Sequence, residues 1–225
     1  MPPTGGLKLT DKDNTHWVGG WATTVSLMDG VTLDGQTIRM VARTSIGGRT
    51  LRVRLSNTYG NGRLEIGAAG VALRDNGAVI IAGLYRALSF NGSPAISIAP
   101  GAMAVSDPVE LDAPALSDLA ISVYLPGRMD DEFRISGHGN SRQTNYISTI
   151  GDFTAAAEFP VAESTEAYLF VAGIDMLAPA GTRGIVTLGD SLTDCNISRV
   201  DANNRWPTGS RAGWSSYTAI LRPAS

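Results

Sequence analysis

The chain has 225 residues, which is enough for one large domain or two small ones. Hydrophobic residues make up 43% of it and charged residues 17%, a balance that excludes general disorder. The formal net charge is −3 and the basic residues form no run, so no nucleic-acid partner is expected. No apolar stretch approaches the roughly 20 residues that span a bilayer, so no membrane span is expected.

The first residues and the cysteine content bear on the cellular compartment. Residues 1–6 contain neither the charged region nor the apolar region of a signal peptide, so none is predicted in this chain. Cys195 is the single cysteine, which excludes an internal disulfide. Composition alone leaves the compartment open.

Residues 1–180 have the alternating pattern of β-strands. In residues 50–57 the pattern predicts one apolar face and one polar face, made by Leu51, Val53 and Leu55 on one side and Arg52, Arg54 and Ser56 on the other. Residues 118–125 repeat the pattern, with Leu119, Ile121 and Val123 as the expected core positions. Residues 36–45 and 168–175 are also predicted strands.

Turn-forming pairs separate these runs. They are found at residues 29–30, 34–35, 60–62, 75–77 and 91–92. Short strands at this spacing predict a mainly β fold, an antiparallel β-sandwich of jelly-roll type, over residues 1–180. Residues 177–182, which contain Pro179 and Gly181, are predicted to form a linker to a second unit at 181–225.

The character of the sequence changes after residue 180. Residues 184–188 are almost wholly apolar, as in a central parallel strand that is covered on both faces. The run ends in the small-residue turn Gly189, Asp190 and Ser191, the place where an α/β domain presents reactive groups. A serine nucleophile needs such an exposed turn and a nearby base. Asp190 can hold the turn by accepting backbone N–H groups, and the Ser191 N–H is a candidate oxyanion donor.

These residues resemble the first conserved block of the GDSL/SGNH hydrolases. The block is Gly184-Ile-Val-Thr-Leu-Gly-Asp-Ser-Leu-Thr-Asp194, followed by Asp201-Ala-Asn-Asn-Arg-Trp-Pro207. The upstream region resembles the β-domain of a bacterial two-domain branch of that family, in stretches at 43–48, 52–57, 106–109, 116–122 and 143–146. The resemblance implies a flavodoxin-like α/β domain from residue 181 and a secreted or periplasmic protein.

The resemblance also implies an activity and roles for single residues. The reaction would be hydrolysis of short-chain, aryl or acetylated-carbohydrate esters through an acyl-serine, with no cofactor and no metal. Ser191 would be the nucleophile and one oxyanion donor, and Asp190 and Asp194 would shape the loop. Cys195 stands where relatives usually have glycine, and we treat it as a bystander.

Two later motifs of the family are not found in the sequence. After Pro207 there is neither the Gly-x-Asn-Asp that completes the oxyanion hole nor the Asp-x-x-His that supplies the base. We therefore expect a catalytic unit that breaks off early and an impaired activity. Relatives continue with a helix like Asp-Trp-Leu-Ala-Arg-Arg-Leu. Codons for Thr208-Gly-Ser-Arg-Ala-Gly-Trp214 can be chosen so that one added G encodes it, and we hypothesise that 208–225 is an out-of-frame tail.

The two histidines are the remaining candidates for a base. His138, in the glycine-rich stretch 136–140, either replaces the missing base of Ser191 or is an exposed loop residue, and the second interpretation is favoured. His16 is expected to be a packed or surface residue. Trp17 and Trp21 are expected to fill the sandwich core and not to stack on a sugar.

The acidic residues and the ligand spacing indicate no other chemistry. Glu158, Glu163 and Glu166 have the pattern of a solvated loop and not of a glycosidase pair. No spacing among cysteine, histidine and aspartate residues indicates a metal site.

Two alternatives to the ester hydrolase stay open. The chain could be a β-sandwich that binds a carbohydrate or another partner and carries a vestigial serine turn, or an active enzyme that recruits His138 to Ser191, within the chain or from a second chain. The apolar run 184–188 is expected either to dock onto the sandwich or to associate chains into a homo-oligomer.

Overall fold

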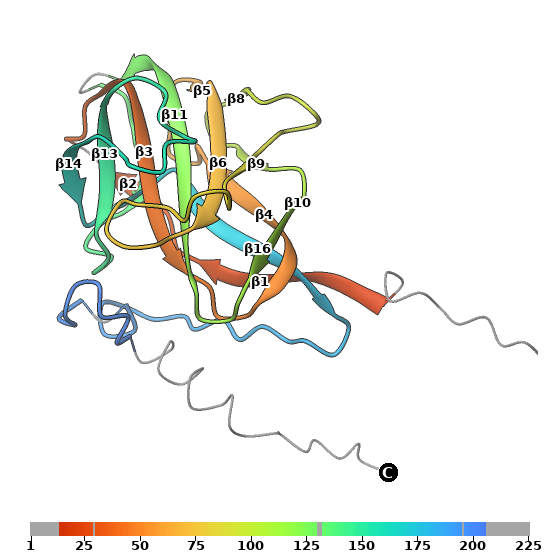
Figure 1. Ribbon diagram of the computed structural model, residues 1–225. Coiled ribbons are helices and arrows are strands. Elements are labelled where there is room, and N and C mark those ends of the chain that lie inside the picture. The colour runs from red at the N-terminus through yellow and green to blue at the C-terminus, as the bar shows by residue number, and fades with distance from the viewer. Residues whose placement is uncertain (1–13, 29, 130–131, 195, 206–225) are drawn as a thin grey trace, which may run out of the picture.

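The structure is a computed structural model that describes residues 14–28, 30–129, 132–194 and 196–205 (Figure 1). The described residues form sixteen strands. In chain order they are β1 (Thr15–Ala22), β2 (Ser26–Met28), β3 (Leu33–Arg43), β4 (Gly48–Ser56), β5 (Leu64–Ile66), β6 (Ala68–Leu73), β7 (Arg86–Ala87), β8 (Ile96–Ile98), β9 (Met103–Val105), β10 (Val109–Ala113), β11 (Asp118–Met129), β12 (Ile135–His138), β13 (Asn145–Ile150), β14 (Val161–Thr165), β15 (Tyr168–Leu169) and β16 (Val171–Pro179). The prediction of a mainly β chain is confirmed.

Two large sheets contain most of these strands, and all pairs are antiparallel. One sheet has the order β1-β16-β4-β10, with β9 also paired to β4. The other has the order β14-β13-β3-β11-β6-β7. Two small sheets, β15-β12-β2 and β5-β8, complete the β region, by which we mean residues 14–180.

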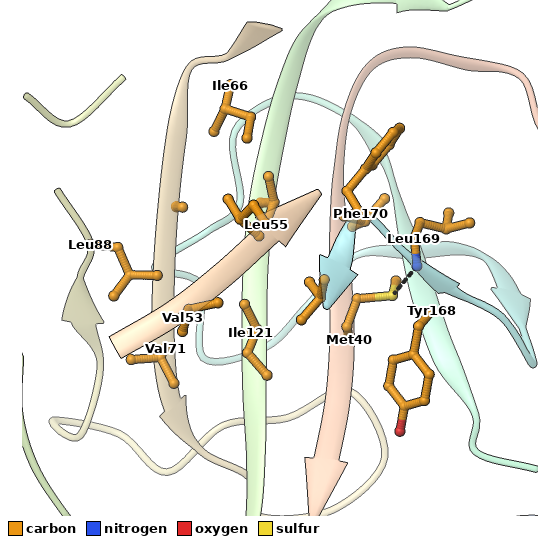
Figure 2. Packing of buried hydrophobic residues seen from close by; sticks show 14 of the residues in the cluster. Met40, Val53, Leu55, Ile66, Val71, Leu88, Ile121, Tyr168, Leu169 and Phe170 are labelled. Atoms are coloured by element: carbon orange, nitrogen blue, oxygen red, sulfur yellow. Dashed lines mark hydrogen bonds between the residues drawn. The ribbon is translucent and has the colours of Figure 1, made fainter. Parts of the chain in front are cut away.

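The hydrophobic core takes side chains from both large sheets. Val53 of β4 belongs to one cluster of buried residues with Met40 of β3, Val71 of β6 and Ile121 of β11 (Figure 2). The small sheet with β15 also contributes, since the Leu169 N–H contacts the sulfur of Met40 at 3.3 Å. The two sheets therefore share one core.

The predicted alternation on β4 and β11 is confirmed at the core positions. Leu51, Val53 and Leu55 are fully buried, as are Leu119, Ile121 and Val123, whereas Arg52 and Arg54 lie on the other face. Ser56 is an exception, since it was expected beside these arginines and is buried. At the end of β4 its N–H donates to Phe170 O at 2.7 Å and its hydroxyl contacts Thr58 Oγ1 at 2.7 Å, so the buried polar groups are paired.

Strand β3 is buried on both faces because loops cover its outer side. The guanidinium of Arg39 lies there, fully buried, and bonds to the Ser122 hydroxyl at 2.8 Å and to Ala78 O at 2.7 Å. Its second terminal nitrogen donates to the carbonyls of residues 153, 154 and 156. The ring of Phe159 lies 4.3 Å from the guanidinium carbon. Burial lowers the pKa of Arg39 to about 10.

Two sequence-based boundaries need correction. The predicted strand 168–175 is divided into β15 and β16 at Phe170, whose φ is +60°. Strand β16 then continues to Pro179 because Leu177 and Pro179 pair with Trp17 and Thr15 of β1. Residues 177–179 of the predicted linker are thus part of a sheet, and the chain leaves it in a turn in which the Thr182 N–H donates to Pro179 O.

One predicted turn also lies inside a strand. Residues 34–35 belong to β3, where Gly35 has a φ of +60°. The pairing of β3 with β11 is irregular at this point, between the pairs of Leu125 and Arg128. The glycine therefore accommodates a bulge and does not end the strand.

Residues 181–194 and 196–205 form neither helix nor strand, so the α/β expectation for this stretch is not supported. The apolar run 184–188, predicted to be a strand, leaves Ile185, Val186 and Leu188 67%, 92% and 96% exposed. No strand among the described residues pairs with it, and a lone strand lacks partners for its backbone groups. The expectation that this run buries itself on the β region is wrong, whereas association between chains stays a prediction.

We call residues 184–205 the serine segment. In Figure 1 it is drawn in blue and runs from the end of β16 back under the β region. Cys195, Trp206, Pro207, the tail 208–225 and residues 1–6 lie outside the described residues. No helix in the described part of the chain is long and apolar enough to cross a membrane.

Candidate functional site

The serine turn is held by hydrogen bonds to Asp190. Its carbonyl accepts the N–H groups of Thr193 at 3.0 Å and Asp194 at 3.1 Å, and its carboxylate accepts the N–H of Leu192 at 2.9 Å. The backbone therefore curls tightly around residues 190–194. Ser191 lies at the start of this curl and is exposed.

Gly189 is required by the close approach of a side chain. A Cβ atom at this position would lie 2.1 Å from Thr193 Oγ1 and 2.7 Å from Thr193 Cβ, distances that no real contact reaches. A glycine is therefore needed for residue 193 to fold back over the turn. This is a steric reason, and it differs from a need for a left-handed backbone conformation.

The end of the turn contacts the β region through His138, the last residue of β12. The imidazole Nε2 lies 2.9 Å from Asp194 Oδ2, and Nδ1 lies 2.8 Å from the carbonyl oxygen of Thr24. The His138 side chain is 21% exposed, so it is not the open loop histidine that the sequence favoured. Both ring nitrogens are engaged, and no hydrogen bond between described residues joins Ser191 Oγ to this imidazole.

Asp201 makes a second contact between the serine segment and the β region. Its carboxylate accepts hydrogen bonds from Gln143 Nε2 at 2.7 Å and from the N–H and hydroxyl of Thr144 at 2.7 and 2.6 Å. Its own N–H donates to Arg142 O at 3.0 Å. We call residues 138–144 the docking loop.

Two arginines complete the contact with the docking loop. Arg142 Nε donates to Ser198 O at 2.7 Å while its Nη1 pairs with Glu166 at 3.0 Å. Arg205 Nη2 donates to Ser141 O at 2.5 Å. The sequence did not predict these contacts, although the stretches 143–146 and 201–207 both contributed to the family resemblance.

The outer face of the β1-β16-β4 sheet presents an aromatic ring among charges. Asp175 of β16 accepts from Arg52 Nε at 3.0 Å and pairs with Arg54 Nη2 at 3.3 Å. The guanidinium of Arg52 lies 4.4 Å from the ring centre of Trp17. Trp17 was expected in the core, and this expectation is wrong. Trp21 does pack against the core, with its ring 4.7 Å from that of Tyr168.

The other candidate residues lie apart from the serine turn or have simple partners. His16 Nε2 lies 3.1 Å from Thr182 O. Glu158 is exposed, Glu163 lies on β14 and not in a loop, and Glu166 pairs with Arg142. Within the described ranges, no group of three or more histidine, aspartate or glutamate side chains could hold a metal ion.

The comparisons with known proteins assign no family. No protein-family model matches this chain, and a search of curated proteins finds no match. Function is therefore argued from the residues of the chain itself.

Proposed function

We propose that the serine segment is the nucleophile turn of a carboxylic ester hydrolase of GDSL/SGNH type. The observation that carries this proposal is the exposed Ser191 on a turn that Gly189 permits and Asp190 holds. A reactive serine needs an accessible hydroxyl on a constrained backbone, and this turn provides both. The substrates would be short-chain, aryl or acetylated-carbohydrate esters.

The reaction proceeds in two balanced steps. Ser191 Oγ attacks the ester carbonyl carbon, its proton passes to a base, and the alcohol leaves with a proton as the acyl-serine forms. Water then attacks the acyl-serine, which releases the carboxylic acid and restores the hydroxyl. The Ser191 N–H is one donor to the oxyanion. We expect slow turnover, because the sequence contains no Asp-x-x-His to supply the usual base.

The β region is proposed to be the jelly-roll sandwich that precedes the catalytic block in two-domain relatives. Support comes from the two antiparallel sheets on one core and from the attachment of the serine segment to the docking loop. In this arrangement the β region would carry the turn and fix its position.

A fluorophosphonate probe tests the proposed nucleophile. The probe should label the protein, peptide mapping should place the label on Ser191, and Ser191→Ala should abolish it. Ser164→Ala is the matched control, since Ser164 is an exposed serine on β14 and should have no influence. A protein that stays unlabelled between about pH 6 and 9, or a label on another serine, would sink the proposal.

The outer sheet face favours a second candidate function, binding of a carbohydrate. Trp17 is partly exposed beside Arg52, Asp175 and Arg54, and sugars bind to aromatic rings flanked by hydrogen-bonding groups. Binding to a panel of polysaccharides should be lost in Trp17→Ala and kept in Ser191→Ala. Tyr59→Ala is the control for a generally sticky aromatic, because Tyr59 is exposed elsewhere. Equal binding by Trp17→Ala would exclude this face.

A further inference from the structure

We infer that His138 is a positioning residue, which holds Asp194 and thereby the end of the serine turn only while its imidazole is protonated on both nitrogens. The contact joins β12 to residues 190–194, and it is the point at which the turn itself meets the β region. Its effect on the reaction of Ser191 rests on the proposed function, but the contact does not.

The partners of the two nitrogens determine where protons lie. The Thr24 carbonyl can only accept, so Nδ1 carries a proton at 2.8 Å from it. An ionised carboxylate also only accepts, so the contact of Nε2 with Asp194 at 2.9 Å needs a second proton. Both requirements are met by the imidazolium ion, and the resulting charge-assisted hydrogen bond is of the strong kind.

Loss of one proton reverses the contact. A neutral imidazole that keeps Nδ1–H for Thr24 directs the lone pair of Nε2 at the carboxylate of Asp194, and the two repel each other. Histidine side chains change charge between about pH 5 and 8, so the turn should be released as the pH rises through this range. The contacts of Asp201 do not involve the imidazole and should persist.

The surrounding charged groups are engaged elsewhere. On the strands beside β12, β2 has no ionisable side chain, and Tyr168 of β15 donates its hydroxyl to Val41 O at 2.7 Å. In the docking loop Arg142 pairs with Glu166. In the serine segment Asp190 accepts the Leu192 N–H, Asp201 binds the docking loop and Arg205 donates to Ser141 O. Asp194 is therefore the charged partner that decides the behaviour of His138.

Amide hydrogen exchange of the full chain tests the inference, with rates corrected for the intrinsic effect of pH. Protection of the N–H groups of Thr193 and Asp194, which bond to Asp190, should fall roughly tenfold between about pH 5.5 and 8. Nitrogen-15 NMR of the wild-type His138 ring should show both nitrogens protonated at the lower pH. Protection that does not change with pH, or a singly protonated ring at the lower pH, would overturn the inference.

Two substitutions of Asp194 separate positioning from other roles. Asp194→Asn places an amide that can donate to a neutral Nε2, so protection should become independent of pH. Asp194→Ala should show low protection at both pH values. His16→Gln is the matched control, since it removes the other histidine and should leave the pH dependence intact. An Asp194→Ala variant that behaves like the wild type would contradict the role of His138.

The alternative role of His138 as the base of Ser191 has a different signature. In that case fluorophosphonate labelling of Ser191 would rise with pH and vanish in His138→Gln, while amide protection of the turn stayed constant. This outcome would overturn the positioning role. Conversely, pH-dependent protection without any labelling would refute the proposed function and leave the positioning role intact.

Discussion

Apolar residues of the β region and of the serine segment have opposite fates. Leu51 and Val53 of β4 are fully buried, whereas Val186 and Leu188 are 92% and 96% exposed. Strand β4 lies between β16 on one side and β9 and β10 on the other, so its backbone groups are paired and its apolar face reaches the core. The run 184–188 has no partner strand within the described residues. An apolar run thus becomes a strand only where neighbours supply hydrogen bonds.

The two regions are also held by different forces. The β region depends on buried apolar area and strand pairing, which are cooperative. The serine segment depends on polar contacts with the docking loop, made by Asp194, Asp201 and Arg205. Changes in one region should therefore leave the other largely unaffected.

The largest contrast is expected between two leucines. Leu51→Ala should lower the free energy of unfolding by about 3–4 kcal/mol, because it opens a cavity in the core. Leu188→Ala should change it by less than about 0.5 kcal/mol. Urea unfolding at low and high protein concentration measures both effects. A cost above about 1 kcal/mol for Leu188→Ala that appears only at high concentration would mean that chains associate through the run 184–188.

Arg39→Lys should have the next largest effect. Lysine keeps the charge but lacks the planar fork that joins Ser122 to the covering loops, so several buried carbonyls lose their donors. We expect a loss of about 2–3 kcal/mol in the free energy of unfolding. Arg63→Lys is the matched control, with a side chain 62% exposed, and should be almost neutral. Equal effects of the two substitutions would show that the buried network contributes little.

Asp201→Ala should act only on the serine segment. It removes the acceptor of three hydrogen bonds from Gln143 and Thr144, so the free energy of local opening of 196–205 should fall by about 1–2 kcal/mol. Amide hydrogen exchange measures this opening, and Asp112→Ala on the exposed face of β10 is the control. Global unfolding should stay unchanged. A comparable loss of global stability would mean that the segment and the β region unfold together.

Tyr168→Phe should have the smallest effect, and it depends on pH. Burial raises the pKa of the Tyr168 phenol, so in the folded chain it stays protonated above about pH 10, where an unfolded chain ionises. Stability is therefore retained below that pH and lost as the pH rises further. The variant should lose about 1 kcal/mol at neutral pH, through the bond to Val41 O, and decline less in alkali. Tyr59→Phe, at an exposed site, should follow the wild type.

The alternating pattern predicted the strands and their core positions because burial on one face leaves a period of two. It could not predict the burial of Arg39, which depends on loops from residues 78 and 153–156 that cover β3. Trp17 and Trp21 look alike in sequence, and only the strand geometry places one outside and the other on the core.

The candidate site was predictable only in part. The turn residues follow from a local motif, whereas the contact of His138 with Asp194 joins residues 56 apart and that of Gln143 with Asp201 residues 58 apart. No local pattern encodes such pairs. The failed strand at 184–188 has the same cause, since hydrophobicity says that a segment prefers burial but not whether a partner is available.

The contacts of Arg39 have a consequence for the order of folding. Its guanidinium joins positions separated by 39, 83 and up to 117 residues along the chain. Such long loops close slowly, so these bonds should form after the rate-limiting step, when both sheets are already in place. Arg39→Lys should then accelerate unfolding while the refolding rate stays nearly constant, and stopped-flow measurement of both arms of the chevron would reveal it.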